Sequence, residues 1–187
     1  MVSKSHSCSR FRFAGDITTL HVRRAPGQTS RGLLLAAGRA FPCALGRSGI
    51  GTIKKEGDGV TPRGRFALLS AMLRTDKVRL RDLRLSWRAI RDIDGWCDEA
   101  GHRLYNRPVT LPFSESHEVL KRQDDLYDMI VVMDHNISRH LSHGGSAIFF
   151  HVAREDLRPT EGCVALRKRD MEWLLPRIGP RTVMHVE

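Results

Sequence analysis

Residues Ser146–Leu166 read SAIFFHVAREDLRPTEGCVAL, and this stretch decides how the chain folds. It contains two apolar runs, Ala147–Val152 and Cys163–Leu166, and the first is rich in aromatic and β-branched residues. Both runs predict strands. The segment between them, Ala153–Gly162, is polar and carries a proline, which is typical of a surface loop. If the two strands lie side by side, the loop brings the end of the first next to the start of the second.

A histidine and a cysteine stand at the two ends of this loop. His151 lies at the end of the first strand, and Cys163 opens the second. A thiol has an ordinary pKa of about 8.5, so a neighbouring imidazole that accepts its proton raises the reactive fraction. Gly162 lets a substrate approach the backbone closely, and the N–H groups of Gly162 and Cys163 are candidates for an oxyanion hole. The alternative interpretation is a buried structural cysteine beside a hydrogen-bonded histidine.

The run TEGCVAL, with FHV upstream, resembles the signature of the L,D-transpeptidase catalytic domain of the YkuD type. That signature is a histidine, a loop, and then Ser/Thr-His-Gly-Cys followed by a hydrophobic residue. Thr160, Gly162 and the nucleophile Cys163 match the second part, and His151 matches the upstream base. The resemblance also implies that Thr160 contacts the substrate.

Two positions of the signature differ, and a second motif supports the resemblance. Glu161 stands where the signature has histidine, and Ala165 stands where it has asparagine or arginine, which places the chain in a divergent branch. Residues Lys54–Phe66 read KKEGDGVTPRGRF and resemble K-x-E-G-D-G-x-T-P-x-G-x-F of that branch. The resemblance implies that this glycine-rich loop packs near the catalytic centre.

The rest of the chain predicts a mainly β fold. We expect a β-sandwich of mixed sheets with a few short helices, forming a single domain over residues 16–187 after a flexible tail at 1–15. Short helices are expected at Ser114–Arg122 and at Lys168–Ile178, the second with Asp170 as its cap. Further strands are expected at Ile17–Val22, Gly32–Ala37, Ala40–Leu45, Phe66–Leu73, Met129–Met133 and Thr182–Val186.

Three polar segments are candidates for walls of the substrate site. Asp94–Asp98 (DGWCD) and Tyr105–Pro108 (YNRP) are expected to be loops, and both look similar to segments of the same family branch. Asp134–Asn136 follows an apolar run, and the end of a strand is a suitable place for functional side chains. We expect five of these side chains to bind substrate: Trp96, Tyr105, Asn106, His135 and Asn136.

The resemblance implies a cysteine acyltransferase that acts on peptidoglycan stem peptides. The carbonyl before a terminal D-alanine would form a thioester on Cys163, and an amine from a second stem would resolve it and cross-link the bacterial cell wall. If water resolves the thioester, the same site is an L,D-carboxypeptidase. No cofactor and no metal is implied. The cell envelope or periplasm is the implied location, although the first residues contain no apolar signal-peptide core.

Composition leaves two other classes of function open. The formal charge is +10, which favours an anionic partner, so a non-enzymatic module that binds the cell wall is one alternative. The other is a metal-dependent hydrolase that uses His135, His140 and His143, the last two lying one helical turn apart. No nucleic-acid motif is present, and no apolar run is long enough for an integral membrane segment. We expect a monomer without a nucleic-acid partner.

Overall fold

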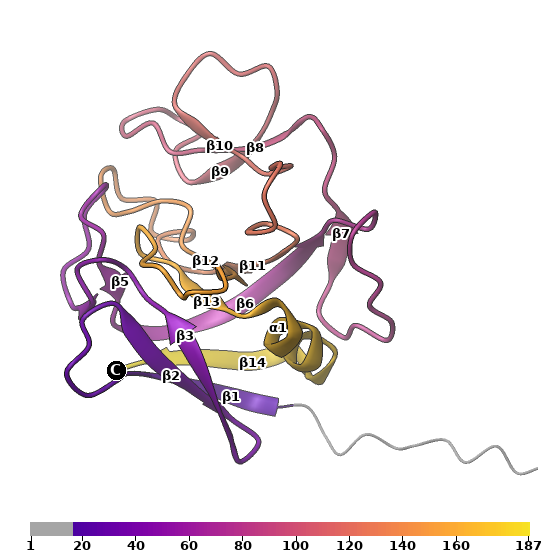
Figure 1. Ribbon diagram of the computed structural model, residues 1–187. Helices are drawn as coiled ribbons and strands as arrows, with labels where there is room; N and C mark the ends of the chain where they lie inside the picture. Colours follow the sequence, from indigo (N-terminus) through magenta and orange to yellow (C-terminus); the bar gives the residue numbers. More distant parts are fainter. Residues whose placement is uncertain (1–16) are drawn as a thin grey trace, which may run out of the picture.

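The computed structural model describes residues 17–187, so the tail expected at 1–15 lies outside the described residues. Most elements are strands, and they form one large sheet, one small sheet and a short strand pair (Figure 1). The large sheet contains β1 (Ile17–Arg24), β2 (Arg31–Ala36), β3 (Arg39–Ala44), β6 (Gly64–Leu73), β7 (Trp87–Ala89), β11 (Met129–Met133), β12 (Phe149–Val152), β13 (Val164–Leu166) and β14 (Ile178–Val186). The small sheet contains β8 (Asp94–Cys97), β9 (Arg107–Thr110) and β10 (His117–Val119), and the short pair is β4 (Ile50–Gly51) and β5 (Thr61–Pro62).

The large sheet curves until it closes on itself. Its strand order is β11-β12-β13-β3-β2-β1-β14-β6-β7, and β11 also pairs with β6. Three pairs are parallel, namely β1 with β14, β12 with β13 and β6 with β7, while the other pairs are antiparallel. The main core fills the inside of this closed sheet. The expectation of a mainly β fold of mixed sheets with a few short helices is confirmed.

Both faces of β11 and β12 are buried, which explains their continuous apolar sequences. On β11, Met129, Val131 and Met133 face the main core, while Ile130 and Val132 belong to a second hydrophobic cluster. That second cluster also receives side chains from the small sheet, which covers the outer face of β11 and β12. The region between the two sheets therefore holds a second apolar cluster outside the main core.

The small sheet corrects two expectations. Asp94–Asp98 and Tyr105–Pro108 were expected to be loops, but β8 and β9 begin within them and pair with one another. The helix expected at Ser114–Arg122 is wrong, because β10 lies there and pairs with β8. A helix this short is marginal by itself, and tertiary pairing decides its conformation. Trp96 holds the small sheet in place by packing edge-on against Phe149, with ring centroids 5.1 Å apart.

The C-terminal helix is confirmed, with a different cap. α1 (Lys168–Leu174) continues into a short 3-10 helix, η1 (Leu175–Arg177). Arg167 is the N-cap residue, and Asp170 makes no side-chain capping bond. The apolar face expected for this segment is buried in the main core: Met171, Leu174, Leu175 and Ile178.

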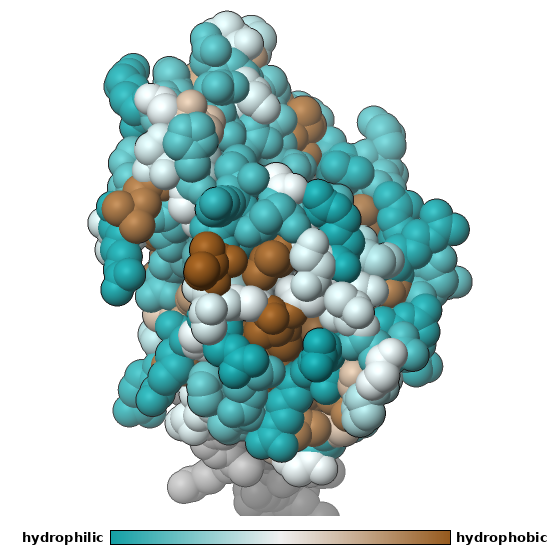
Figure 2. All heavy atoms as spheres, turned by 90° about the vertical axis from the view of Figure 1, so that its left-hand side faces the viewer, coloured by the Kyte–Doolittle hydropathy of each residue, from teal (hydrophilic) through white to brown (hydrophobic). Residues whose placement is uncertain are grey.

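Few large hydrophobic side chains remain exposed. Figure 2 shows a face that is mostly hydrophilic, with a small group of hydrophobic side chains near its centre. Within residues 17–187, no helix is both long and apolar enough to cross a bilayer.

Candidate active site

The pairing of β12 with β13 brings His151 and Cys163 onto one face. The two strands are parallel, with Phe150 opposite Val164 and His151 opposite Ala165. Cys163 precedes β13, so its position in the register is beside Phe149. Because side chains alternate along strands, Phe149, His151 and Cys163 all point to the outer face, beneath the small sheet. Both His151 and Cys163 line one hollow of about 370 Å³.

The thiol of Cys163 is buried and hydrogen-bonded to the backbone that precedes β12. Its Sγ donates to the carbonyl of Ala147 at 3.2 Å and accepts the N–H of Phe149 at 3.3 Å. Burial raises the pKa of Cys163 to about 12, against the smaller opposing effect of the Phe149 N–H. At neutral pH the resting group is therefore a thiol rather than a thiolate.

The imidazole of His151 is held in one tautomer by its neighbours. Nδ1 lies 2.8 Å from the carbonyl oxygen of Val152 and 3.2 Å from that of Leu126. Both partners are acceptors, so Nδ1 carries the proton and Nε2 keeps a free lone pair. Burial lowers the pKa of His151 to about 4. The ring is also packed edge-on against Tyr127, with centroids 5.3 Å apart. At neutral pH His151 is thus an uncharged imidazole held in one orientation.

The turn before the thiol requires glycine. Gly162 has φ +136°, and a Cβ there would meet the Val60 carbonyl oxygen at 2.8 Å and the Ile148 side chain at 2.9 Å. Thr160 closes this turn, because its hydroxyl donates to the carbonyl of Cys163 at 2.7 Å and accepts the Gly162 N–H at 3.2 Å. In the resting site, one N–H of the expected oxyanion hole therefore already has a partner.

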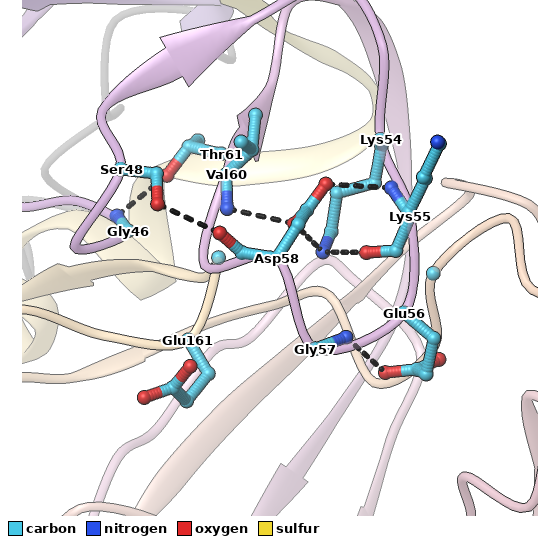
Figure 3. Close-up of polar contacts among 12 residues, drawn as sticks. Gly46, Ser48, Lys54, Lys55, Glu56, Gly57, Asp58, Val60, Thr61 and Glu161 are labelled. Atoms are coloured by element: carbon cyan, nitrogen blue, oxygen red, sulfur yellow. Dashed lines mark hydrogen bonds and ion pairs between the residues drawn. The ribbon is translucent and has the colours of Figure 1, made fainter.

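The motif at Lys54–Phe66 lies against this turn, and Figure 3 shows the polar contacts that order the loop from Lys54 to Thr61. Asp58 is its centre: the carboxylate accepts the Lys54 ammonium at 2.5 Å and the N–H groups of Lys55 and Val60 at 2.6 and 2.8 Å. Burial would raise the pKa of Asp58, but these hydrogen bonds hold it below its ordinary value. The side chain of Lys54 is only 5% exposed. The ordered loop carries Val60 against Gly162, and so fixes the position of the thiol.

Glu161 lines the hollow of Cys163, but its carboxylate is engaged by an arginine at the surface. Its carboxylate accepts a hydrogen bond from the guanidinium of Arg47 at 2.8 Å, and its side chain is 77% exposed. The position that departs most from the family signature therefore lies at the rim of the site, in a surface ion pair.

Three of the predicted substrate contacts lie behind the site. The Asn106 side chain accepts the indole N–H of Trp96 at 3.0 Å and the N–H of Ala147 at 3.1 Å, and it donates to the His135 carbonyl at 3.1 Å. The Tyr105 hydroxyl donates to Glu56. Trp96, Tyr105 and Asn106 are almost fully buried, and they position the backbone that the thiol contacts. Their contact with substrate stays a prediction.

His135 and Asn136 line a different hollow from that of Cys163. His135 Nε2 contacts the Gly144 carbonyl at 3.0 Å, and His140 Nε2 contacts the Tyr105 carbonyl at 2.6 Å. The helical turn expected at His140 and His143 is wrong, because both residues have positive φ and neither lies in a helix. Two of the three histidines proposed for a metal site are therefore engaged with backbone carbonyls.

The hollow also contains acidic residues that the sequence did not single out. Glu118 opposes Trp96 in the small sheet, and burial together with the neighbouring Asp98 raises the pKa of Glu118. One oxygen of Asp98 is buried without a hydrogen-bond partner among the described residues. Both carboxylates line the hollow of Cys163, as do Arg154 and Arg158. Only the pairing of β8 with β10 makes these acids neighbours, so local sequence carried no signal for them.

The closed, mainly β fold thus brings a cysteine, a histidine and a glycine turn together at one hollow. The L,D-transpeptidase catalytic domain family (YkuD) matches residues 31–186, and the chain belongs to this family. A solved L,D-transpeptidase from Mycobacterium tuberculosis H37Rv is similar at 14% identity and a TM-score of 0.45, over 92% of this chain and 58% of that one. The chain thus spans little more than half of that structure. No curated protein sequence matches it.

Proposed function

We propose that this chain is an L,D-transpeptidase that forms a thioester on Cys163 and transfers the acyl group to an amine of peptidoglycan. One observation carries the proposal: Cys163 and a neutral, oriented His151 face the same hollow. Membership of the YkuD family supplies the reaction class. The cell envelope, where peptidoglycan lies, is the proposed location.

The geometry supports a two-step reaction. The Cys163 proton moves to Nε2 of His151 as sulfur attacks the carbonyl carbon, because both groups are neutral at rest. The backbone N–H groups of Gly162 and Cys163 stabilise the oxyanion, with the Gly162 N–H leaving Thr160 for it. The C–N bond then breaks, and the leaving D-alanine takes the proton from His151. In the second step an acceptor amine attacks the thioester carbon and the C–S bond breaks, while a proton of the amine passes through His151 to the sulfur and restores the thiol.

The charges of the hollow suit a zwitterionic substrate. Asp98 and Glu118 face it from the small sheet, and Arg154 and Arg158 face it from the loop after β12. The buried carboxylate oxygen of Asp98 lacks a hydrogen-bond donor, and a substrate ammonium would supply one. A stem peptide with a free amine and a free carboxylate at its diaminopimelate residue carries both complementary groups.

Transfer, rather than hydrolysis alone, needs room for a second stem peptide. A larger and more open hollow of about 920 Å³ adjoins the first and shares Leu126, Ala153 and Arg154 with it. We assign the acceptor strand to this groove.

The test is incubation of the full chain with purified muropeptides, followed by mass analysis of the products. A dimer that has lost one D-alanine supports transfer, and a shortened monomer alone identifies a carboxypeptidase. If no product forms with any tetrapeptide donor, while the variant Cys163→Ala and the wild type give identical mixtures, the proposal is wrong. Fractionation of native cells tests the location, and a wholly cytoplasmic protein would contradict it.

A further inference from the structure

A group of potential metal ligands lies on the outer face of the large sheet, where β1 pairs with β14. The two strands are parallel, and His21 lies directly opposite His185. Their neighbours Leu20 and Met184 are fully buried, so alternation turns the two imidazoles outward. Figure 1 shows β1 and β14 side by side, on the side of the molecule away from the small sheet.

Glu187 completes the group. It follows His185 by two positions, and one carboxylate oxygen and one nitrogen from each imidazole all lie within 4.8 Å of one another. The two rings are tilted by 59°, with centroids 5.7 Å apart. Among residues 17–187, this is the one group of three or more such side chains with that spacing.

The unsatisfied atom of this group points to a ligand. Nδ1 of His21 is buried and has no hydrogen-bond partner among the described residues. A buried polar nitrogen without a partner is unfavourable, and a bound cation would use its lone pair. This observation separates the group from ordinary surface histidines, whose nitrogens are satisfied by water.

We propose that His21, His185 and Glu187 form a binding site for a divalent transition-metal ion of the zinc class. Two imidazoles and one carboxylate suit zinc, whereas Mg²⁺ and Ca²⁺ prefer sites made of oxygen alone. In a tetrahedral site with bonds of about 2.1 Å, ligand atoms lie about 3.4 Å apart. Small side-chain rotations therefore close the site, and a fourth position stays open to water. The ion joins the first described strand to the last.

Nearby arginines limit the affinity. Arg23 already holds Glu187 at 2.8 Å in an ion pair whose side chains are 59% and 36% exposed, and such a pair yields readily to a stronger ligand. Arg65 lies opposite His185 on β6, which adds a second positive charge. We therefore expect a dissociation constant in the micromolar range, and we expect Arg23→Gln to tighten it by about tenfold.

Titration of the chelator-treated full chain with Zn²⁺ by calorimetry tests the site, with Mg²⁺ as the control ion. We expect one equivalent of Zn²⁺ to bind and to raise the unfolding temperature. Glu187→Gln and His185→Gln should each weaken binding at least tenfold, while the matched control His143→Gln, at an exposed histidine elsewhere, should leave it unchanged. Circular dichroism verifies that each variant folds. If His185→Gln does not fold, the Glu187→Gln variant still tests the site.

Cobalt substitution identifies the ligands independently. Co²⁺ at this site should give visible d–d bands without the near-ultraviolet band of a thiolate ligand. A thiolate band, unchanged affinity in both ligand variants, or no binding at all would overturn the proposal. None of the three residues lines the hollow of Cys163, so this outcome is independent of the proposed transpeptidase activity.

Discussion

Cys43 and Cys163 lie in two regions of the molecule that differ in chemistry although their thiols are equally weak acids. Burial raises the pKa of each to about 12. Cys43, on β3, packs in the main core, and its one opposing influence is a hydrogen bond to the backbone of Gly32. Cys163 faces the outer hollow together with His151. The two thiols therefore differ in their neighbours and not in their resting pKa, and under the proposed function an oriented base and access for substrate make Cys163 the nucleophile.

The largest expected effect is the difference between substituting Cys163 and substituting Cys43. Cys163→Ala should abolish turnover and also the covalent adduct with a carbapenem, which members of this family accept as an acyl donor. Cys43→Ala should keep the adduct but lose about 1–2 kcal/mol of stability, because it leaves a cavity in the core. Intact-mass analysis and urea denaturation measure the two effects. An adduct that persists in Cys163→Ala would contradict the comparison.

The second effect concerns His151, the proposed base, which has no counterpart beside Cys43. His151→Gln should lower turnover by about 10²–10⁴-fold through loss of the proton acceptor. In the wild type, the acid limb of kcat/KM should fall near pH 4, because burial lowers the pKa of His151 to about 4. A pH profile with its acid limb near 6.5, the ordinary pKa of histidine, would show that another group acts as the base.

The buried imidazole should also make stability depend on pH. Between pH 6.5 and 4 the unfolded chain binds a proton at His151 and the folded chain does not. The free energy of unfolding therefore keeps its full value above pH 6.5 and decreases as the pH falls towards 4. The loss from this residue approaches about 3 kcal/mol. Urea denaturation at pH 7 and pH 4.5 should show a smaller loss for His151→Gln than for the wild type. Burial also lowers the pKa of His135, which contributes equally to both proteins. Equal losses would mean that the His151 pKa is ordinary.

The fourth effect concerns the acids that line the hollow of Cys163 and have no counterpart at Cys43. Asp98→Asn should raise KM about tenfold or more for a stem peptide with a free ammonium, since it removes one charge-assisted hydrogen bond. The same peptide with its side-chain amine acetylated should bind wild type and variant alike. If the variant loses affinity equally for both peptides, Asp98 acts on the fold rather than on the ammonium.

The strands that carry His151 and Cys163 could be predicted from the sequence, whereas the small sheet that covers them could not. β12, β13 and the turn at Gly162 follow from local apolar runs and from a backbone that needs glycine, so the sequence could predict that Cys163 and His151 share one hollow. The small sheet could not be predicted in this way, because its strands are only three or four residues long and are held by pairing with one another and by the packing of Trp96. Asp98 and Glu118 became neighbours by that pairing, as His21 and His185 did by the parallel pairing of the first and last strands.

The smallest expected effect concerns Glu161, the acid nearest to Cys163 in sequence. A carboxylate that faced the thiol would raise its pKa, and removing the charge would then speed alkylation sharply. Glu161 instead faces solvent and pairs with Arg47, and it is a minor contributor to the raised pKa of Cys163. Glu161→Gln should therefore change the rate of iodoacetamide alkylation by less than about threefold, and stability by about 1 kcal/mol or less. Arg47→Gln is the matched control: it frees the carboxylate and should leave the rate within the same range. A rate increase beyond tenfold in Glu161→Gln alone would mean that the carboxylate reaches the thiol in solution, and the environment of Cys163 would then differ from that of Cys43 in charge as well as in its base.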